Sequence, residues 1–253
     1  MAELVDRPLL MLVVLFVGLL AAAMLGVVAQ NAWSPIKASD HSELAIVQSG
    51  ALTLLGLIVG FSFSMAITRY DQRKNLEEAE ANAIGTAYVR ADLMPASAAA
   101  PMRSTLRRYL DHRILIYVTA DRGELERISA ETAKLGADLW ASARSVVAAD
   151  PTPASALVAW SINDVLNSAD TTTAAWLDRV PIPAWWLLVL IGVGANVTLG
   201  FGTKRFNSLL LVIVPLTVAI SAFLIADIDS PRGGVVQVAP ENLNRLAKSL
   251  SAP

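Results

Sequence analysis

The stretch AIVQSGALTLLGLIVGFSFSMAI, residues 45–67, carries no charge, and TRYDQRKNLEEAEANAIGTAYVRADL follows it directly as residues 68–93. A bilayer core about 30 Å thick needs about 20 apolar residues in a helix, because an open strand would leave backbone groups unpaired in lipid. Residues 45–67 therefore predict a membrane-spanning helix. No Pro or Gly interrupts residues 68–84, so we expect this helix to run on to about Leu93, with more than half of it outside the bilayer.

Three further uncharged stretches predict membrane spans: Leu9–Ala29, Trp185–Phe201 and Leu209–Ala226. The second of these is short, but Ile182 extends it and the paired Trp185 and Trp186 are typical of an interfacial anchor. Charged residues make up 17% of the chain, against about 25% in soluble domains, which agrees with a membrane protein.

The first stretch could instead be a cleaved signal peptide, since Val-Val-Ala precedes Gln30 as at a cleavage site. A signal peptide begins with positive charge, whereas this chain begins with Glu3, Asp6 and only Arg7. We therefore expect the stretch to be retained as a membrane anchor.

Four crossings place both termini and residues 68–181 on one side of the membrane. Basic residues near span ends are more numerous on that side (Arg7, Arg69, Arg73, Lys74, Arg179 and Arg232) than on the other (Lys37, Lys204 and Arg205). The positive-inside rule then predicts a multi-pass protein of the cytoplasmic (inner) membrane, with both termini in the cytoplasm.

The predicted fold class is an all-α membrane protein with four transmembrane helices and a helical cytoplasmic domain between the second and third. Apolar residues at 3–4 spacing predict three helices in that domain, with stripes beginning at Met102, Leu125 and Val158. The expected parts are transmembrane helices 1 and 2 in 1–67, the cytoplasmic helical domain in 68–181, transmembrane helices 3 and 4 in 182–229, and a cytoplasmic C-terminal tail in 230–253.

Composition excludes several kinds of chemistry. The net charge of −2 predicts no nucleic-acid partner, and the absence of cysteine with only two histidines predicts no zinc site. Asp40-His41-Ser42-Glu43 is interpreted as a solvated loop rather than a metal site. No catalytic motif is present, so neither an enzyme nor a cofactor is expected. The predicted spans lack ionisable residues, which argues against coupled transport but not against a passive pore.

Small residues four apart predict close helix contacts in three of the spans. They are Gly18, Ala22 and Gly26 in the first, Gly56, Gly60 and Ser64 in the second, and Gly192, Asn196 and Gly200 in the third. The spacing leaves open whether these contacts form within one chain or between copies.

One face of the second span could line a pore if several copies surrounded an axis. Its candidate residues are Leu54, Ile58, Phe61, Ser62 and Met65. Arg69 and Arg73 would then form a ring that attracts anions. In the alternative, this face meets lipid or a neighbouring helix, and the two arginines anchor the membrane interface.

Two polar groups are expected near the inner interface. Asp227 and Asp229 at the end of the fourth span could pair with Arg69 or Arg73, or could hold a cation. Glu80, Asn82, Thr86 and Arg90 lie close together along the extension of the second span. Structural ion pairs are the favoured interpretation of the aspartates.

These residues carry a family resemblance. The segments Phe61–Ala66, Arg69-Tyr-Asp71-Gln-Arg73, Glu80–Pro95 and Asp227-Ile-Asp-Ser-Pro-Arg232-Gly233 resemble the bestrophin-like domain family of bacteria and plants. The resemblance implies kinship with bestrophins, which are pentameric anion channels with a pore-lining second helix. Few aromatic residues stand where the bestrophin neck has them. The bestrophin calcium site uses a dense run of acidic residues after the fourth span, whereas this chain has only Asp227 and Asp229 there, so calcium activation is not expected.

The resemblance and the arginines Arg69 and Arg73 together favour a homo-oligomeric channel that conducts anions, chloride in particular, with membrane lipid and inorganic ions as its partners. A pentamer is implied by the resemblance alone. A non-conducting scaffold or sensor, whose helical domain binds a partner, is the first alternative. A cation channel that uses Asp227 and Asp229 is the second.

Overall fold

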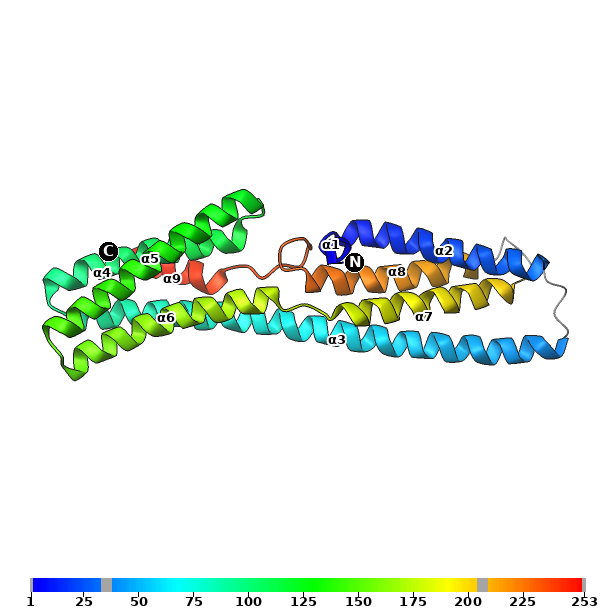
Figure 1. The fold of residues 1–253 in the computed structure, drawn as a ribbon, viewed down its shortest axis with the longest axis horizontal. Coiled ribbons are helices and arrows are strands. Elements are labelled where there is room, and N and C mark those ends of the chain that lie inside the picture. The colour runs from blue at the N-terminus through cyan, green and yellow to red at the C-terminus, as the bar shows by residue number, and fades with distance from the viewer. Residues whose placement is uncertain (1, 33–37, 204–208, 252–253) are drawn as a thin grey trace. The chain divides into compact units, whose positions relative to one another are not determined.

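The computed structural model describes residues 2–32, 38–203 and 209–251, and the side chains within these ranges except those of 2, 3 and 38–42. The predictions that involve Lys37, Lys204, Arg205 and the Asp40–Ser42 side chains therefore lie outside the described residues. Every regular element in the described ranges is a helix (Figure 1).

The helices in chain order are α1 (Ala2–Val5), α2 (Pro8–Ala32), α3 (Ala38–Arg90), the 3₁₀ turn η1 (Ala91–Leu93), α4 (Ala96–Val118), α5 (Arg122–Ala149), α6 (Pro153–Leu177), α7 (Ile182–Phe201), α8 (Leu210–Asp229) and α9 (Glu241–Ser251). Four apolar segments are long enough to cross a membrane, and they include α2, α3, α7 and α8. The predicted all-α fold with four span-length helices and a helical domain after the second is confirmed, as is the helix that continues from the second span to the residues before Pro95.

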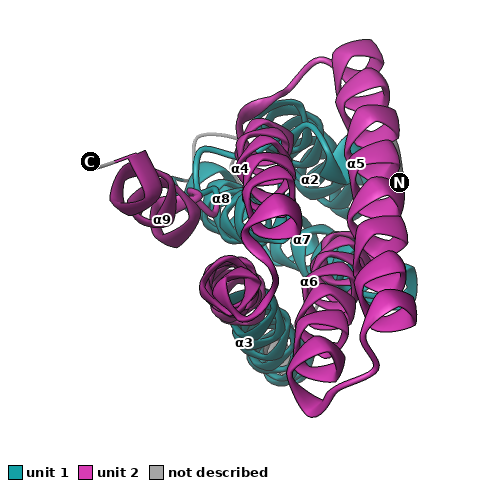
Figure 2. Ribbon diagram, turned by 90° about the vertical axis from the view of Figure 1, so that its left-hand side faces the viewer, with its two compact units in different colours: residues 1–69, 179–237 teal, residues 70–178, 238–253 magenta. Residues whose placement is uncertain are grey.

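The chain divides into two compact units (Figure 2). Unit 1 contains residues 1–69 and 179–237, and unit 2 contains residues 70–178 and 238–253. In unit 1, α2 packs against both α7 and α8. The apolar core of this unit includes Met11, Leu19, Leu188 and Ile225. Trp185 is also buried there, so of the predicted interfacial pair only Trp186 is exposed.

Glycine allows α2 and α7 to approach to backbone contact. A Cβ atom on Gly200 would lie 1.8 Å from the carbonyl oxygen of Ala23, and one on Gly26 would lie 2.1 Å from that of Val197. Because no side chain separates the two backbones here, the contact between α2 and α7 accounts for Gly26 and Gly200 of the small-residue motifs within one chain.

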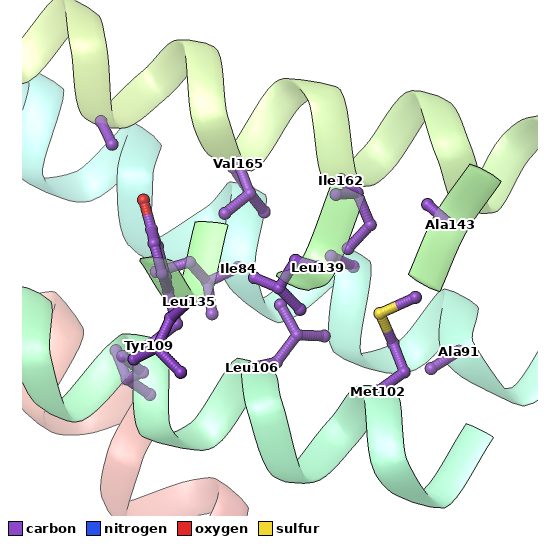
Figure 3. Packing of buried hydrophobic residues seen from close by; sticks show 14 of the residues in the cluster. Ile84, Ala91, Met102, Leu106, Tyr109, Leu135, Leu139, Ala143, Ile162 and Val165 are labelled. Carbon is purple, nitrogen blue, oxygen red and sulfur yellow. The ribbon is translucent and has the colours of Figure 1, made fainter. Parts of the chain in front are cut away.

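Unit 2 has a core of its own, built from α3, α4, α5, α6 and α9. All three predicted apolar stripes contribute to it, and buried side chains from four helices meet around Ile84, Leu106, Leu139 and Ile162 (Figure 3).

Capping residues mark the starts of two helices of unit 2. Asp121 caps α5 by accepting a hydrogen bond from the Glu124 N–H, and Thr152 and Ser155 form a capping box at the start of α6.

Candidate functional site on helix α3

Helix α3 has one buried and one exposed stripe along its length. The buried stripe includes Leu55, Ser62, Ala66, Arg73, Glu77, Glu80, Ile84 and Ala87. On the opposite side, the exposed stripe consists of Leu57, Phe61, Ser64, Thr68, Asp71, Asn75, Glu78, Asn82 and Thr86. Both stripes follow the three- and four-residue spacing of a single helix face.

The apolar part of α3 is far more exposed than the other three candidate spans. In its most apolar window only 6% of the residues are buried, against 33–44% in the others. No described atom lies within 4 Å of a Cβ placed on Gly56 or Gly60. Among the described residues, none packs against the Gly56 and Gly60 surface of α3, in contrast to Gly26 of α2 and Gly200 of α7.

The five predicted pore-lining residues do not share one environment. Leu54, Phe61 and Met65 are exposed, whereas Ile58 packs against the core of unit 1 and Ser62 is buried. The exposed stripe is centred on the side opposite Ser62, so it runs through Leu57 and Phe61.

The two arginines predicted to attract anions lie on or near the buried side of α3. Arg73 is only 1% exposed, and Arg69 is half-buried. The charged residues of the exposed stripe are Asp71 and Glu78. Lys74 is also exposed and offsets one of these negative charges.

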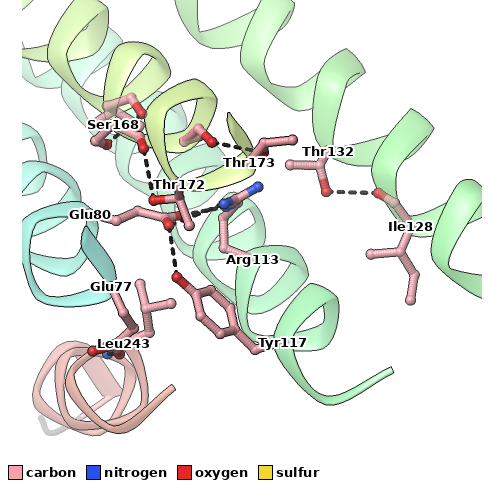
Figure 4. A network of polar contacts seen from close by, with 12 residues as sticks. Glu77, Glu80, Arg113, Tyr117, Ile128, Thr132, Ser168, Thr172, Thr173 and Leu243 are labelled. Carbon is pink, nitrogen blue, oxygen red and sulfur yellow. Dashed lines mark hydrogen bonds and ion pairs between the residues drawn. The ribbon is translucent and has the colours of Figure 1, made fainter. Parts of the chain in front are cut away.

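A charged network anchors the buried side of α3 within unit 2 (Figure 4). Glu80 forms a bidentate ion pair with Arg113 of α4, in which Arg113 Nη2 lies 3.1 Å from Glu80 Oε2. The Tyr117 hydroxyl donates to the same Oε2 at 3.4 Å. Burial by itself would lower the pKa of Arg113, but the hydrogen bond and charge of Glu80 raise it overall. Burial raises the pKa of Tyr117 above its ordinary range, so its hydroxyl stays a donor.

Glu77, one turn before Glu80, holds the start of helix α9. Its carboxylate accepts hydrogen bonds from the Leu243 N–H at 2.9 Å and from Asn242 Nδ2 at 2.7 Å. Leu243 is fully buried (Figure 4), and Leu246 and Leu250 pack against the unit 2 core, so one face of α9 docks there. A carboxylate from another helix thus supplies acceptors that the first turn of α9 requires.

Asp227 and Asp229 bind backbone groups in unit 1. Asp227 accepts hydrogen bonds from the N–H groups of Val235 and Val236 at 2.7 and 2.9 Å, and Asp229 accepts one from Val180 at 3.0 Å. A Cβ atom on Gly234 would lie 2.2 Å from the Asp227 carbonyl oxygen, so this turn requires glycine. The chain after α8 therefore turns back and bonds to the last turn of α8 through Asp227.

Basic residues surround the same turn. Arg179 pairs with Asp6 at 2.7 Å, and Arg232 is half-buried nearby. Burial lowers the pKa of Arg232, and the adjacent charge of Arg179 lowers it further. In the described residues, no three His, Asp or Glu side chains gather as metal ligands would.

Sequence reasoning missed Glu77, Arg113 and Tyr117. A signal was available for two of them. Glu77 shares the three- and four-residue spacing of Arg73, Glu80 and Ile84, and Arg113 falls between Tyr109 and Tyr117 on an apolar stripe. A charge at an otherwise apolar core position predicts a buried partner.

These features define a class: an all-helical membrane protein with four span-length apolar helices and a helical unit inserted between the second and third. A family model described as Bestrophin-like domain matches residues 17–243. The chain belongs to this bestrophin-like family.

Solved structures share the fold. A bacterial bestrophin homologue from Klebsiella pneumoniae, carrying one substitution, matches with a TM-score of 0.65 and 13% identity over 94% of this chain and 95% of that chain. A zinc-phased structure of a homologue from the same organism gives 0.62 and 14% over 94% and 95%. A structure described only as a membrane protein gives 0.63 and 14% over 93% and 97%. A search of curated proteins found no match.

Proposed function

We propose that the protein is a homo-oligomeric ion channel in which the exposed stripe of α3, contributed by several copies, surrounds the conduction path. The observation that carries this proposal is the exposure of α3, the least covered of the four candidate spans. Copies packed around an axis would cover its Gly56 and Gly60 surface, against which no described residue of the same chain packs. Family membership supports the proposal, and a pentamer rests on the bestrophin resemblance alone.

Along the stripe, the apolar residues Leu57 and Phe61 give way to the hydroxyls of Ser64 and Thr68 and then to charged residues. An apolar constriction beside a polar mouth is sufficient for passive conduction. In this proposal the protein lies in the cytoplasmic (inner) membrane, with lipid around it and with unit 2 and both termini in the cytoplasm, as the basic residues at the span ends predict.

Phe61→Ala is expected to increase ion flux several-fold, because Phe61 is 62% exposed and is the largest side chain of the stripe. The measurement is flux in liposomes that contain the purified full-length protein. Phe63→Ala is the matched control, since Phe63 lies on another side of α3 and should leave flux near the wild-type value.

Absence of flux from correctly folded wild-type protein would overturn the channel proposal. Absence of flux together with tight co-purification of another protein would instead support a non-conducting scaffold or sensor.

Ion preference distinguishes two candidate functions. Chloride conduction is the expectation from Arg69 and Arg73, yet Arg73 is buried. Cation conduction is the second candidate, because Asp71 and Glu78 are the charged residues of the exposed stripe. Asp227 and Asp229 support neither, since their carboxylates bind backbone N–H groups.

The reversal potential under a potassium chloride gradient tests this choice. If Asp71 faces the path, Asp71→Asn should move the reversal potential toward the chloride equilibrium value, because it removes one negative charge per copy at the mouth. Glu126→Gln on α5 is the control, as it removes an exposed charge elsewhere. A shift with Arg69→Gln but not with Asp71→Asn would favour the anion channel.

A further inference from the structure

Helices α3 and α9 form an open groove within unit 2, with a volume of about 620 Å³. Its polar lining consists of Asn82, Thr86 and Arg90 from α3 and Asn242, Arg245 and Ser249 from α9. Three of these residues belong to the 80–95 segment that carries the family resemblance, whereas Glu80 of that segment points into the buried network instead. Asn82 and Thr86 also belong to the exposed stripe of α3, whereas the proposed conduction path does not account for Arg90.

The groove has positive charge without compensation. Its lining contains two arginines and no carboxylate. Arg245 is exposed and forms no ion pair or hydrogen bond with the described residues. The Arg90 guanidinium stacks on the Trp160 ring at 5.6 Å, and its buried Nη1 has no hydrogen-bond acceptor in the described part of the chain. Stacking orients Arg90 without neutralising it.

Apolar groups complete the groove. Val89 and Leu246 line it beside the polar residues, and a Cβ atom on Gly85 would lie 3.3 Å from Leu246 Cδ1. Glycine at this position therefore allows α9 to lie close to α3. The volume falls within the range of about 300–1,000 Å³ that is usual for small-molecule sites.

We propose that this groove binds a small organic anion, with its carboxylate or phosphate group held by Arg90 and Arg245 and its apolar part against Val89 and Leu246. Planar guanidinium groups match the oxygens of either oxyanion and form strong charge-assisted hydrogen bonds with them. The amide of Asn82 adds a neutral donor from α3, whereas Asn242 Nδ2 already donates to Glu77. The proposal does not depend on ion conduction, because binding is measured without flux.

Isothermal titration of the full-length protein in detergent, at low chloride, tests the proposal with phenyl phosphate, benzoate, phenol and inorganic phosphate as probes. We expect saturable binding of phenyl phosphate or benzoate at one site per chain. Arg245→Gln should weaken it about tenfold or more, as expected for loss of a charge-assisted hydrogen bond. Lys248→Gln removes the same charge from α9 outside the groove and should change affinity less than about twofold.

Arg90→Gln should weaken binding to a similar extent, with thermal unfolding of the same sample showing whether loss of the Trp160 contact has altered the fold. Arg245→Gln remains decisive if Arg90→Gln is unstable, because Arg245 is exposed. The proposal is overturned if neither organic anion binds saturably, if phenol binds as tightly as phenyl phosphate, or if Lys248→Gln weakens binding as much as Arg245→Gln. Equal affinity for inorganic and phenyl phosphate would overturn the organic part of the assignment.

Discussion

Replacing Arg113 with Met is expected to lower the free energy of unfolding by about 3–5 kcal/mol, the usual cost of leaving one member of a buried ion pair alone. Glu80 is fully buried, and Arg113 supplies both guanidinium contacts to its carboxylate. Of the donors in the network around Glu80, only the Tyr117 hydroxyl at 3.4 Å would then remain. A single neutral donor cannot compensate a carboxylate that has been removed from water.

A double-mutant cycle distinguishes the pair from simple loss of packing. Glu80→Leu combined with Arg113→Met should recover most of the lost stability, since an apolar replacement of both partners removes the unpaired charge. The measurement is thermal unfolding of the full-length protein in detergent. Arg127→Met is the control: Arg127 pairs with Glu124 and Glu131 on the surface, where screening makes such pairs weak. If Arg113→Met and Arg127→Met lowered the stability of the protein equally, burial would not explain the contribution of the Glu80–Arg113 pair.

Gly200→Ala should destabilise unit 1 by about 3 kcal/mol or more, at the upper end of the cost of overpacking. The added methyl would lie 1.8 Å from the Ala23 carbonyl oxygen, which is a backbone atom and cannot rotate away. Helices α2 and α7 would have to separate along their contact. Gly26→Ala should act in the same way from the other helix, since its methyl would lie 2.1 Å from the Val197 carbonyl oxygen.

The chain provides a matched control on each helix. Gly194 on α7 and Gly18 on α2 have no described atom within 4 Å of the position that an added Cβ would occupy, so Ala at either should leave unfolding unchanged or slightly raise its temperature. The measurements are the unfolding temperature and the yield of monodisperse protein. Unfolding of Gly200→Ala at the same temperature as Gly194→Ala would show that α2 and α7 do not approach to backbone contact.

The sequence determined the fold class because the properties that decide it act over short distances. An uncharged stretch of about 20 residues is stable in a bilayer only as a helix, and the lack of a break after Ile67 continues that helix to Arg90. Apolar spacing likewise located the helices α4, α5 and α6 of unit 2. These features follow from local hydropathy and backbone chemistry.

The rotation of α3 about its axis depends on tertiary packing. Helical spacing placed Leu54, Phe61 and Ser62 relative to one another, but it could not indicate which side of the helix meets the rest of unit 1. The structure buries Ser62 and Arg73 and exposes Phe61 and Asp71. A path along the exposed stripe would therefore meet the Asp71 carboxylate rather than the Arg73 guanidinium.

Pairings between distant residues were also decided only by the tertiary structure. Glu80 meets Arg113 from 33 positions away, and Glu77 meets Leu243 from 166 positions away. A buried charge predicts that a partner exists, because desolvation is costly, but it does not identify that partner. The small-residue motifs show the same division. Their spacing predicted close contacts, and only the packed helices show that Gly26 of α2 and Gly200 of α7 meet a backbone, while no described residue packs against Gly56 or Gly60 of α3.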